Sequence, residues 1–378
     1  MEEKQEQKFQ QMTETPVGRL ICHLALPCII SMLVTAFYNM ADTFFVGMLQ
    51  SNSATAAVGV VFSLMAVLQA IGFFFGHGSG NFISRELGRH HYEEASNMAA
   101  TGFFCALATG GVIAVLGLLF LDPLARALGS TETILPYARD YMRFILIGAP
   151  YMTASLVLNN QLRFQGSAVY GMVGIASGAV LNIALDPIFI FTLDMGVAGA
   201  ALATILSQLV SFCLLLVGCT RGGNLHIRIS NVRLQKRFFR EILRGGLPSL
   251  ARQGLSSVAA ICLNHAAQPY GDAAIAAMSV VSRIMNFASS ALIGFGQGFQ
   301  PVCGFNYGAQ LYGRVRRAFW FCVKVSTVCL VVIAVAGACF SSQLIALFRD
   351  DPVVVEYGTT ALRLQWLSFP TVGFVTMS

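Results

Sequence analysis

Two acidic residues, Asp42 and Asp186, lie well inside long apolar stretches of the sequence. A charged side chain in the middle of a membrane span costs roughly 2.5–3.5 kcal/mol on insertion scales, so such residues mark functional sites by default. Asn182 precedes Asp186 by four residues. Tyr38 and Asn39 precede Asp42 by four and three residues. Side chains at these spacings share one face of a helix, so carboxylates and carboxamides would come together if the two helices meet.

The chemistry open to these side chains is the binding of a small cation or a proton. Carboxylate, carboxamide and hydroxyl oxygens are hard donors that suit Na⁺. Two neighbouring carboxylates can equally share one proton, because like charges at short range resist full ionisation. Pro187 also frees a backbone carbonyl one turn earlier as a further ligand. Asp42 alone could instead cap or pack against a neighbouring backbone. Two acidic residues at similar depth, with Thr204 at a comparable depth, favour a functional site.

The elements that must position these residues are membrane helices. Of the 378 residues, 56% are hydrophobic and only 11% are charged, whereas roughly a quarter are charged in soluble domains. So few charges cannot cover a soluble surface of this size, which excludes a soluble globular protein, a disordered chain and a nucleic-acid binder. Helices are the only open-chain structure that lipid permits, because every backbone polar group needs an internal partner. We therefore predict an all-α polytopic membrane protein.

Ten apolar runs reach the length of about 20 residues that a bilayer-spanning helix needs. They lie near residues 20–46, 53–76, 98–120, 137–159, 169–191, 197–218, 243–267, 273–299, 318–340 and 357–378. With the N-terminus inside, 16 of the 24 Lys and Arg residues fall in inner segments and at most four in outer ones. This bias predicts a multi-pass protein of the cell inner (plasma) membrane with a cytoplasmic N-terminus.

An internal repeat with an offset of 220 residues divides the chain into two halves. Its matches include Gly76 with Gly296, Gly78 with Gly298, Tyr137 with Tyr357, Arg143 with Arg363 and Pro150 with Pro370. Six spans per repeat give both halves the same orientation, related by an axis along the membrane normal. The expected parts are a cytoplasmic tail at 1–19, a first lobe with spans one to six at 20–218, a basic cytoplasmic linker at 219–242 and a second lobe with spans seven to ten at 243–378.

The second half stops at the counterpart of Leu158, before the partners of spans five and six. We therefore expect two parallel six-helix bundles, the second of them incomplete, with ten of twelve spans present. The alternative is a ten-span protein whose second bundle stays open.

Other motifs carry less weight. The glycines at 72, 76 and 80, and those at 294 and 298, are spaced for close helix packing. They are not phosphate loops, because no strand precedes them and no Gly-Lys-Ser/Thr sequence exists. The ten cysteines contain no CxxC pair, which argues against a zinc site or a disulfide framework. With no metal motif or nucleophile–base pair inside the spans, we expect a transporter and not an enzyme.

The sequence resembles the multidrug and toxic compound extrusion (MATE) family, and its DinF/MepA-like branch best. The resemblance runs from about Leu24 to the end and is carried by residues 26–47, the Gly-rich end of the second span, residues 181–187 and residues 196–204. It implies twelve helices in two lobes and drug efflux coupled to Na⁺ or H⁺ entry. The residues that match the branch's cation site and its polar network are Asp42, Asn182, Asp186 and Thr204, together with Asn159.

The second half departs from the NorM-like branch, which also places acidic residues there. Span seven of this chain carries Arg252 and Gln253, and span ten has only Glu356 at its edge. This departure argues against a cation site in the second lobe.

Three functions compete. The first is a secondary active multidrug efflux antiporter that exports organic, often cationic, compounds in exchange for Na⁺ or H⁺. Its coupling site would be Asp42, Asn182, Asp186 and Thr204, with Tyr38, Asn39 and Asn159 in the polar network or substrate pocket. The second is a lipid-linked saccharide flippase of the same superfamily, which predicts a cationic lumen around Arg252 and Arg283; snorkelling is the alternative role for these arginines. The third, a membrane enzyme, ranks last.

The expected partners are small-molecule drugs or organic cations and membrane lipids, with no nucleic acid, and the expected state is a monomer. No cofactor is expected beyond Na⁺ or H⁺ as the coupling ion, and no metal beyond Na⁺ at the coupling site.

Overall fold

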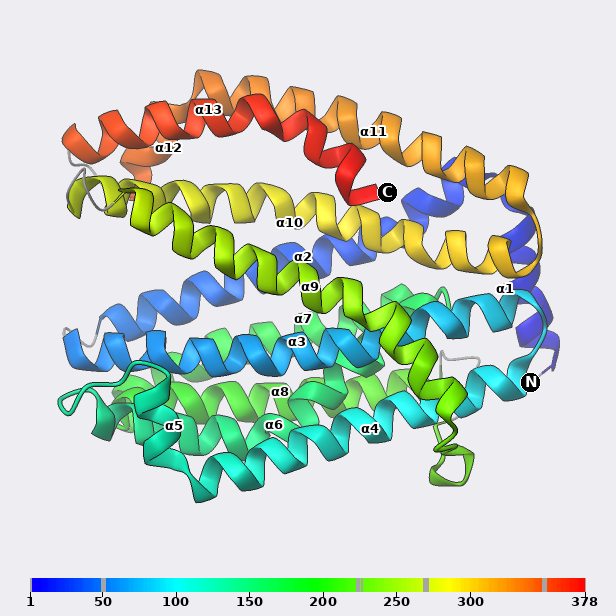
Figure 1. Cartoon of the computed structure of the whole chain (residues 1–378), viewed down its shortest axis with the longest axis horizontal. Helices are drawn as coiled ribbons and strands as arrows, with labels where there is room; N and C mark the ends of the chain where they lie inside the picture. Colours follow the sequence, from blue (N-terminus) through cyan, green and yellow to red (C-terminus); the bar gives the residue numbers. More distant parts are fainter. Residues whose placement is uncertain are drawn as a thin grey trace.

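The computed structural model describes residues 2–48, 52–221, 225, 227–267, 272–348 and 352–377. The regular structure in these ranges is helical, and helices cover nearly all of each predicted apolar run (Figure 1). The long helices are α2 (Val17–Gly47), α3 (Asn52–Gly88), α4 (Tyr92–Leu119), α6 (Leu135–Phe164), α7 (Ala168–Pro187), α8 (Gly196–Arg221), α9 (Lys236–Ala267), α10 (Asp272–Gly308), α11 (Tyr312–Cys339) and α13 (Pro352–Met377).

Short helical segments connect or extend the long ones. They are α1 (Glu2–Glu14), α5 (Leu121–Ala127), the π-helix η1 (Ile188–Thr192), the 3₁₀-helix η2 (Ile229–Asn231) and α12 (Ser341–Phe348). The polar segment predicted as a tail at 1–19 therefore contains a helix, α1.

Seven helices in the described residues are long and apolar enough to cross a membrane, judged by length and composition. They cover Val17–Val46, Ala57–Gly88, Tyr92–Leu119, Leu135–Phe164, Ala168–Thr192, Gly196–Arg221 and Tyr312–Cys339. The other three predicted spans coincide with α9, α10 and α13, which have 32, 37 and 26 residues. α9 is the most polar of the three because its sequence carries four arginines. The full set of ten spans and the six-helix bundles remain predictions.

The long helices pack in two groups. The first helix group consists of α3, α4, α6, α7 and α8 and occupies the lower part of Figure 1; the second consists of α10, α11 and α13 and occupies the upper part. α2 contacts α7 of the first group and α10 of the second, and α9 lies mainly against α3. α2 therefore connects the two groups, whereas α9, from the second half of the sequence, packs on the first group.

Glycines allow the helices of these groups to approach closely. The three glycines of α3 that are spaced by four residues, Gly72, Gly76 and Gly80, face α6 at Leu156, Asn160 and Phe164. On α10, Gly294 and Gly298 face α2 at Ile29 and Ala25. A Cβ atom on Gly294 would lie 2.6 Å from the Ile29 Cα atom, closer than real Cβ contacts. The predicted role of these glycines in close helix packing is confirmed.

The two groups are also joined at the end of the molecule that carries α1, at the right of Figure 1. There α3 packs on α9, and a Cβ atom on Gly78 would lie 2.5 Å from the Ile242 carbonyl oxygen. Across the same contact, the Arg85 Nη2 atom lies 2.6 Å from Glu241 Oε2. An apolar core that extends into this end includes Leu87 of α3 and Phe305 of α10. We call this end the α1 end.

α1 itself bridges the two groups. Lys8 Nζ donates to the Gly166 carbonyl, at the α6–α7 turn, at 2.6 Å. Asn306 Nδ2 of α10 donates to the Met12 carbonyl at 3.1 Å, and Met12 is fully buried. Burial lowers the pKa of Lys8 from its ordinary value. The polar N-terminal segment is thus part of the packed structure.

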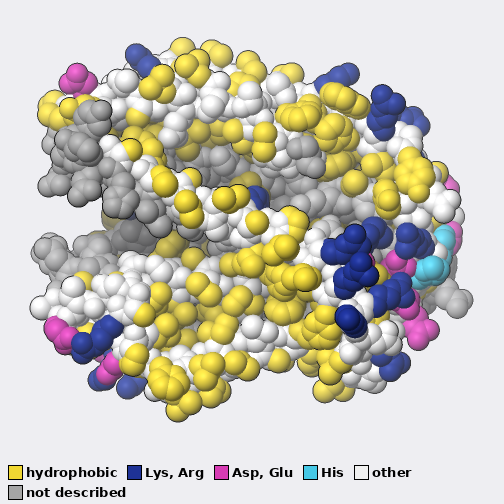
Figure 2. Space-filling model, in the orientation of Figure 1, with side chains coloured by type: hydrophobic (Ala, Val, Ile, Leu, Met, Phe, Trp, Pro, Cys, Tyr) yellow, Lys and Arg dark blue, Asp and Glu magenta, His cyan; other side chains and the backbone are white. Residues whose placement is uncertain are grey.

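Away from the α1 end, large apolar side chains of α2, α3 and α9 are exposed. Phe44, Phe62 and Leu255 are 64%, 59% and 69% exposed. Figure 2 shows the charged side chains mainly near the two ends of the long axis, with a largely apolar surface between them. This distribution is typical of a protein that sits in a bilayer.

Candidate cation site

The acidic residues singled out in the sequence lie on two helices that pack against each other. Asp42 lies on α2 and Asp186 on α7, and these helices are in contact. Thr204 comes from α8, which also packs against α7. Asp186 is fully buried, and Asn182 and Thr204 are each 1% exposed. Helix packing therefore brings together two carboxylates that are more than 140 residues apart in the sequence.

The hydrogen bonds of this cluster centre on Asn182. Its Nδ2 atom donates to Asp186 Oδ1 at 3.3 Å and to Thr204 Oγ1 at 3.5 Å. The Thr204 hydroxyl donates to the Ala200 carbonyl at 3.0 Å, within its own helix. The four-residue spacing therefore puts Asn182 beside Asp186, and the packing of α8 adds the hydroxyl of Thr204.

Two tyrosines complete the cluster. Tyr38 of α2 and Tyr141 of α6 each interact with the Thr204 hydroxyl. Each also lies within electrostatic range of Asp42 and Asp186. Sequence reasoning found Tyr38 and missed Tyr141, which is 1% exposed. The signal that identifies Tyr141 is its depth, because it lies close to the predicted outer end of its span, as Thr204 does.

Three oxygen atoms of the cluster are buried without a hydrogen-bond partner. They are Asp42 Oδ1, Asn182 Oδ1 and Asp186 Oδ2. A buried polar atom left unpaired costs about 1–3 kcal/mol, so each one calls for an explanation. Among the described residues, neither carboxylate forms an ion pair with a Lys or Arg. These oxygens fit a hard cation such as Na⁺, and either carboxylate can take up a proton instead.

The backbone next to Asp186 leaves the α-helical pattern. Pro187 has no amide hydrogen and cannot donate to the Ile183 carbonyl. α7 ends at this proline and continues as the π-helix η1. The Leu193 amide donates to the Ile188 carbonyl at 2.9 Å, five residues back. Short π-helical turns occur often at functional sites, and this one follows the carboxylate directly.

A cavity of about 1040 Å³, including the open space at its mouth, adjoins the cluster. Four of the residues predicted for the cation site or its polar network line it: Tyr38, Asn39, Asn159 and Asn182. The rest of the wall is mixed, with apolar side chains such as Phe62 and Met65 and polar ones such as Gln69 and Gln208. Tyr38 and Asn182 belong to both the cavity wall and the carboxylate cluster.

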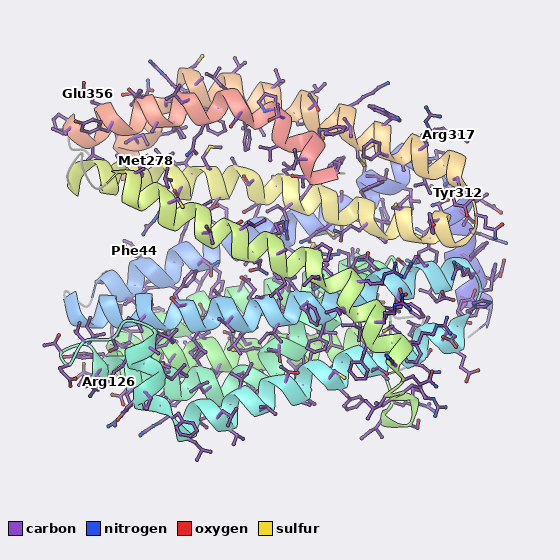
Figure 3. The ribbon with its side chains drawn as sticks, in the orientation of Figure 1. Phe44, Arg126, Met278, Tyr312, Arg317 and Glu356 are labelled. Atoms are coloured by element: carbon purple, nitrogen blue, oxygen red, sulfur yellow. The ribbon has the colours of Figure 1, made fainter. Side chains whose placement is uncertain are left out.

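The basic and acidic residues noted in the second half take different positions. Arg252 is exposed and lines a separate cavity beside α9 and α10. Arg283 is exposed and does not line that cavity. Glu356 lies near the start of α13, at the left end of the molecule in Figure 3. Among the described residues, the carboxylates of the cluster therefore come only from α2 and α7.

Comparison with known protein families gives one family for most of the chain. The sequence model of the MatE family matches residues 27–188 and 248–378. A protein named multidrug export protein MepA from Staphylococcus haemolyticus is 28% identical over 369 residues, which are 97% of this chain and 80% of that protein. The protein of the same name from Staphylococcus aureus strain N315 is 26% identical over 356 residues, covering 94% of this chain and 79% of the relative.

Comparison with solved structures also finds MATE transporters. A MATE structure in complex with MaD3S superimposes with a TM-score of 0.91, at 28% identity over 98% of this chain and 82% of the other. The outward-facing conformation of a multidrug resistance MATE transporter superimposes with a TM-score of 0.90, at 28% identity and the same coverage. A MOP superfamily transporter from Pyrococcus furiosus, described as having a binding pocket of reversed polarity, gives a TM-score of 0.88 at 28% identity, over 98% of this chain and 84% of the other.

Proposed function

The chain belongs to the MATE family of membrane transporters, and from this premise we propose that it is a secondary multidrug efflux antiporter. It would export organic, often cationic, compounds in exchange for Na⁺ or H⁺ by alternating access. The relatives named as multidrug export proteins support the substrate class. The observation that carries the proposal is the trio of unpaired buried oxygens on Asp42, Asn182 and Asp186.

The coupling ion would act by compensating this negative cluster. Na⁺ or a proton at Asp42 and Asp186 relieves the repulsion between the carboxylates and satisfies oxygens that otherwise lack a partner. Such an ion stabilises the conformation in which α2 and α7 are packed together. Coupling requires only that the ion prefers this conformation over the alternative one.

The substrate would bind in the adjoining cavity. Its wall combines apolar side chains with carboxamides and hydroxyls that can orient a drug-sized organic molecule. Tyr38 and Asn182 serve both the cavity and the cluster, so a rearrangement on ion binding changes the cavity wall. This shared wall is the physical link between ion entry and substrate release.

We further propose that the N-terminus is cytoplasmic and that the α1 end faces the cytoplasm. The close contacts of α3 with α9 and α10 at that end then form the inner barrier. In this orientation the substrate cavity would exchange with the outside.

The test is transport by the full-length protein in proteoliposomes. A cationic dye is followed under an imposed Na⁺ gradient and, separately, under an imposed pH gradient. Dye movement should follow one gradient and fall to background in Asp42→Asn. The matched control is Asp140→Asn, because Asp140 is an exposed carboxylate of α6. Undiminished transport by Asp42→Asn would contradict the assignment of the coupling site.

The lipid-linked saccharide flippase is the second candidate, and Arg252 is the observation that favours it. This arginine lines a cavity between α9 and α10, as the cationic lumen requires, whereas Arg283 does not. A flippase would not move the cationic dye under either gradient. Its deletion would deplete a cell-envelope polymer while drug sensitivity stayed unchanged.

A further inference from the structure

A second cavity, of about 620 Å³, lies where the first helix group meets α9 and the second group. Residues of α3, α9, α10 and α13 line it, and they include His77, Ser249, Arg252 and Gln300. The ionisable side chains among these lining residues are both basic, and none of the described lining residues is acidic. Its chemistry is therefore opposite to that of the carboxylate cluster.

The histidine of this cavity has an unused ring nitrogen. His77 is 5% exposed, and its ring stacks on Phe73 with a centroid distance of 5.3 Å. Its Nδ1 atom is hydrogen-bonded to Ser249 Oγ of α9 at 2.7 Å, whereas Nε2 is buried without a partner. When the Ser249 hydroxyl donates to Nδ1, Nε2 carries the ring proton and is a free donor.

A buried arginine stands next to the same cavity. Arg163 of α6 is 3% exposed. Its Nη2 atom donates to Asn160 Oδ1 at 2.7 Å and to Gln300 Oε1, in the cavity wall, at 3.2 Å. Its Nε atom has no partner. Arginine keeps its charge in proteins, and both of its hydrogen-bond acceptors are neutral. The positive charge is therefore buried without a counterion among the described residues.

The three basic groups act on one another. Arg163 and Arg252 both lie within electrostatic range of His77, and Arg252 lies within range of Arg163. Arg163 is buried, and a buried charge without a counterion is costly, whereas Arg252 is exposed. An anion in the cavity would compensate both positive charges. Guanidinium groups match carboxylate and phosphate oxygens in geometry and charge.

The cavity is also bordered by apolar surface. Pro248 and Ile293 belong to its wall. Leu255, one turn beyond Arg252 on α9, is 69% exposed. A ligand that places an acidic group among the basic side chains would therefore place an apolar portion against α9.

We propose that this second cavity binds the acidic group, phosphate or carboxylate, of an amphipathic molecule, held by Arg252, Arg163 and His77. The site goes beyond the proposed cation-coupled efflux, because it is separate from the carboxylate cluster and takes a ligand of opposite charge. The acidic group can belong to a transported amphiphile or to a membrane lipid, since both offer the same chemistry.

The test is direct binding to the purified full chain in a neutral detergent, measured by microscale thermophoresis. The probes are dodecyl phosphate and dodecyltrimethylammonium, which share a chain and differ in headgroup charge. Dodecyl phosphate should bind, and Arg252→Gln should weaken its binding about tenfold, as expected for a lost charge-assisted hydrogen bond. The control is Arg363→Gln, because Arg363 is an exposed arginine of α13 that does not line the cavity.

Arg163→Gln is the second variant, with size-exclusion chromatography as a check on folding. Equal dodecyl phosphate affinity in the wild type, Arg252→Gln and a folded Arg163→Gln would overturn the proposal. Dodecyltrimethylammonium binding that Arg252→Gln weakens as much as dodecyl phosphate binding would also overturn it. Equilibrium binding needs no ion gradient, so a failure of gradient-driven dye transport would leave this result intact.

Two arms identify the source of the acidic group. In the first, native mass spectrometry measures phosphatidylglycerol retained by the wild type and by Arg252→Gln; selective loss in the variant indicates a lipid headgroup. In the second, proteoliposomes of neutral lipid are tested for uptake of dodecyl phosphate; uptake indicates a transported amphiphile. Either positive result supports the site, and negative results in both arms together with unaltered affinity in Arg252→Gln reject it.

Discussion

The carboxylate cluster and the second cavity are two polar centres of opposite charge in one apolar protein. The cluster around Asp42 and Asp186 leaves acceptor oxygens unpaired, and the cavity around His77 and Arg163 leaves nitrogen atoms unpaired. At the ends of the molecule, by contrast, several charges occur in pairs. Arg85 meets Glu241 at the α1 end, and Arg139 meets Asp122 near α5.

This difference separates structural charges from candidate ligand sites. A paired, partly exposed charge is satisfied by its neighbour and contributes little to stability, with a typical value of about 0–1 kcal/mol. An unpaired buried polar group lowers stability until a ligand satisfies it. The sign of the unpaired atoms then indicates the charge of the ligand. The predictions below test this distinction.

The largest effect is expected at the carboxylate cluster. In the double variant Asp42→Asn/Asp186→Asn, the thermal stabilisation of the purified protein by its coupling ion should disappear. An ion at a hundredfold its Kd adds about 2.7 kcal/mol to stability, which is a shift of several degrees in Tm. Thermal unfolding is followed during a Na⁺ titration at constant pH and during a pH titration without Na⁺. Asp140→Asn should keep the full shift, and a retained shift in the double variant would show that the ion binds elsewhere.

A smaller effect is expected from Tyr141→Phe. This change removes only the hydroxyl that interacts with Thr204, at a typical cost of about 1 kcal/mol. The same Tm shift should therefore need about fivefold more ion in the variant than in the wild type. The control is Tyr137→Phe, because Tyr137 lies on the same helix and is 42% exposed. If both variants titrate like the wild type, Tyr141 serves only as packing.

The smallest effect is expected at the paired charges near α5. The hydrogen bond and charge of Arg139 lower the pKa of Asp122, which lies outside the predicted spans. A carboxyl whose pKa is depressed on folding adds stability above its unfolded pKa, and this is lost as the pH falls through the folded value. The Asp122→Asn variant lacks this contribution. Below about pH 4, its stability should therefore fall slightly less steeply with decreasing pH than that of the wild type. Thermal unfolding from pH 3 to 7 measures this, and a change centred near neutral pH would contradict it.

Much of the helical framework could be predicted from the sequence because it depends on local patterns. An apolar run of about 20 residues forms a helix in lipid whatever its neighbours are. The four-residue spacing of Asn182 and Asp186 likewise determines that they share a helix face. The glycine spacing of α3 predicted close packing, and Gly72, Gly76 and Gly80 indeed face α6.

Other features required the tertiary structure, because they join residues that have no local relation. His77 and Ser249 are hydrogen-bonded across 172 positions, and Arg163 reaches Gln300 across 137. Tyr141 enters the carboxylate cluster only because α6 packs against α8. The helicity of α1 and its bridging contacts also escaped sequence reasoning, since a polar segment carries no hydropathy signal.

The sequence by itself determined the membrane class, the approximate helix positions and the residue pairs that share a helix face. The tertiary structure decided which faces meet, and so which oxygens and which guanidinium groups are buried together. The physical reason lies in the range of the interactions. Helix formation in an apolar environment is governed by contacts within four residues, whereas burial and pairing depend on how distant helices pack.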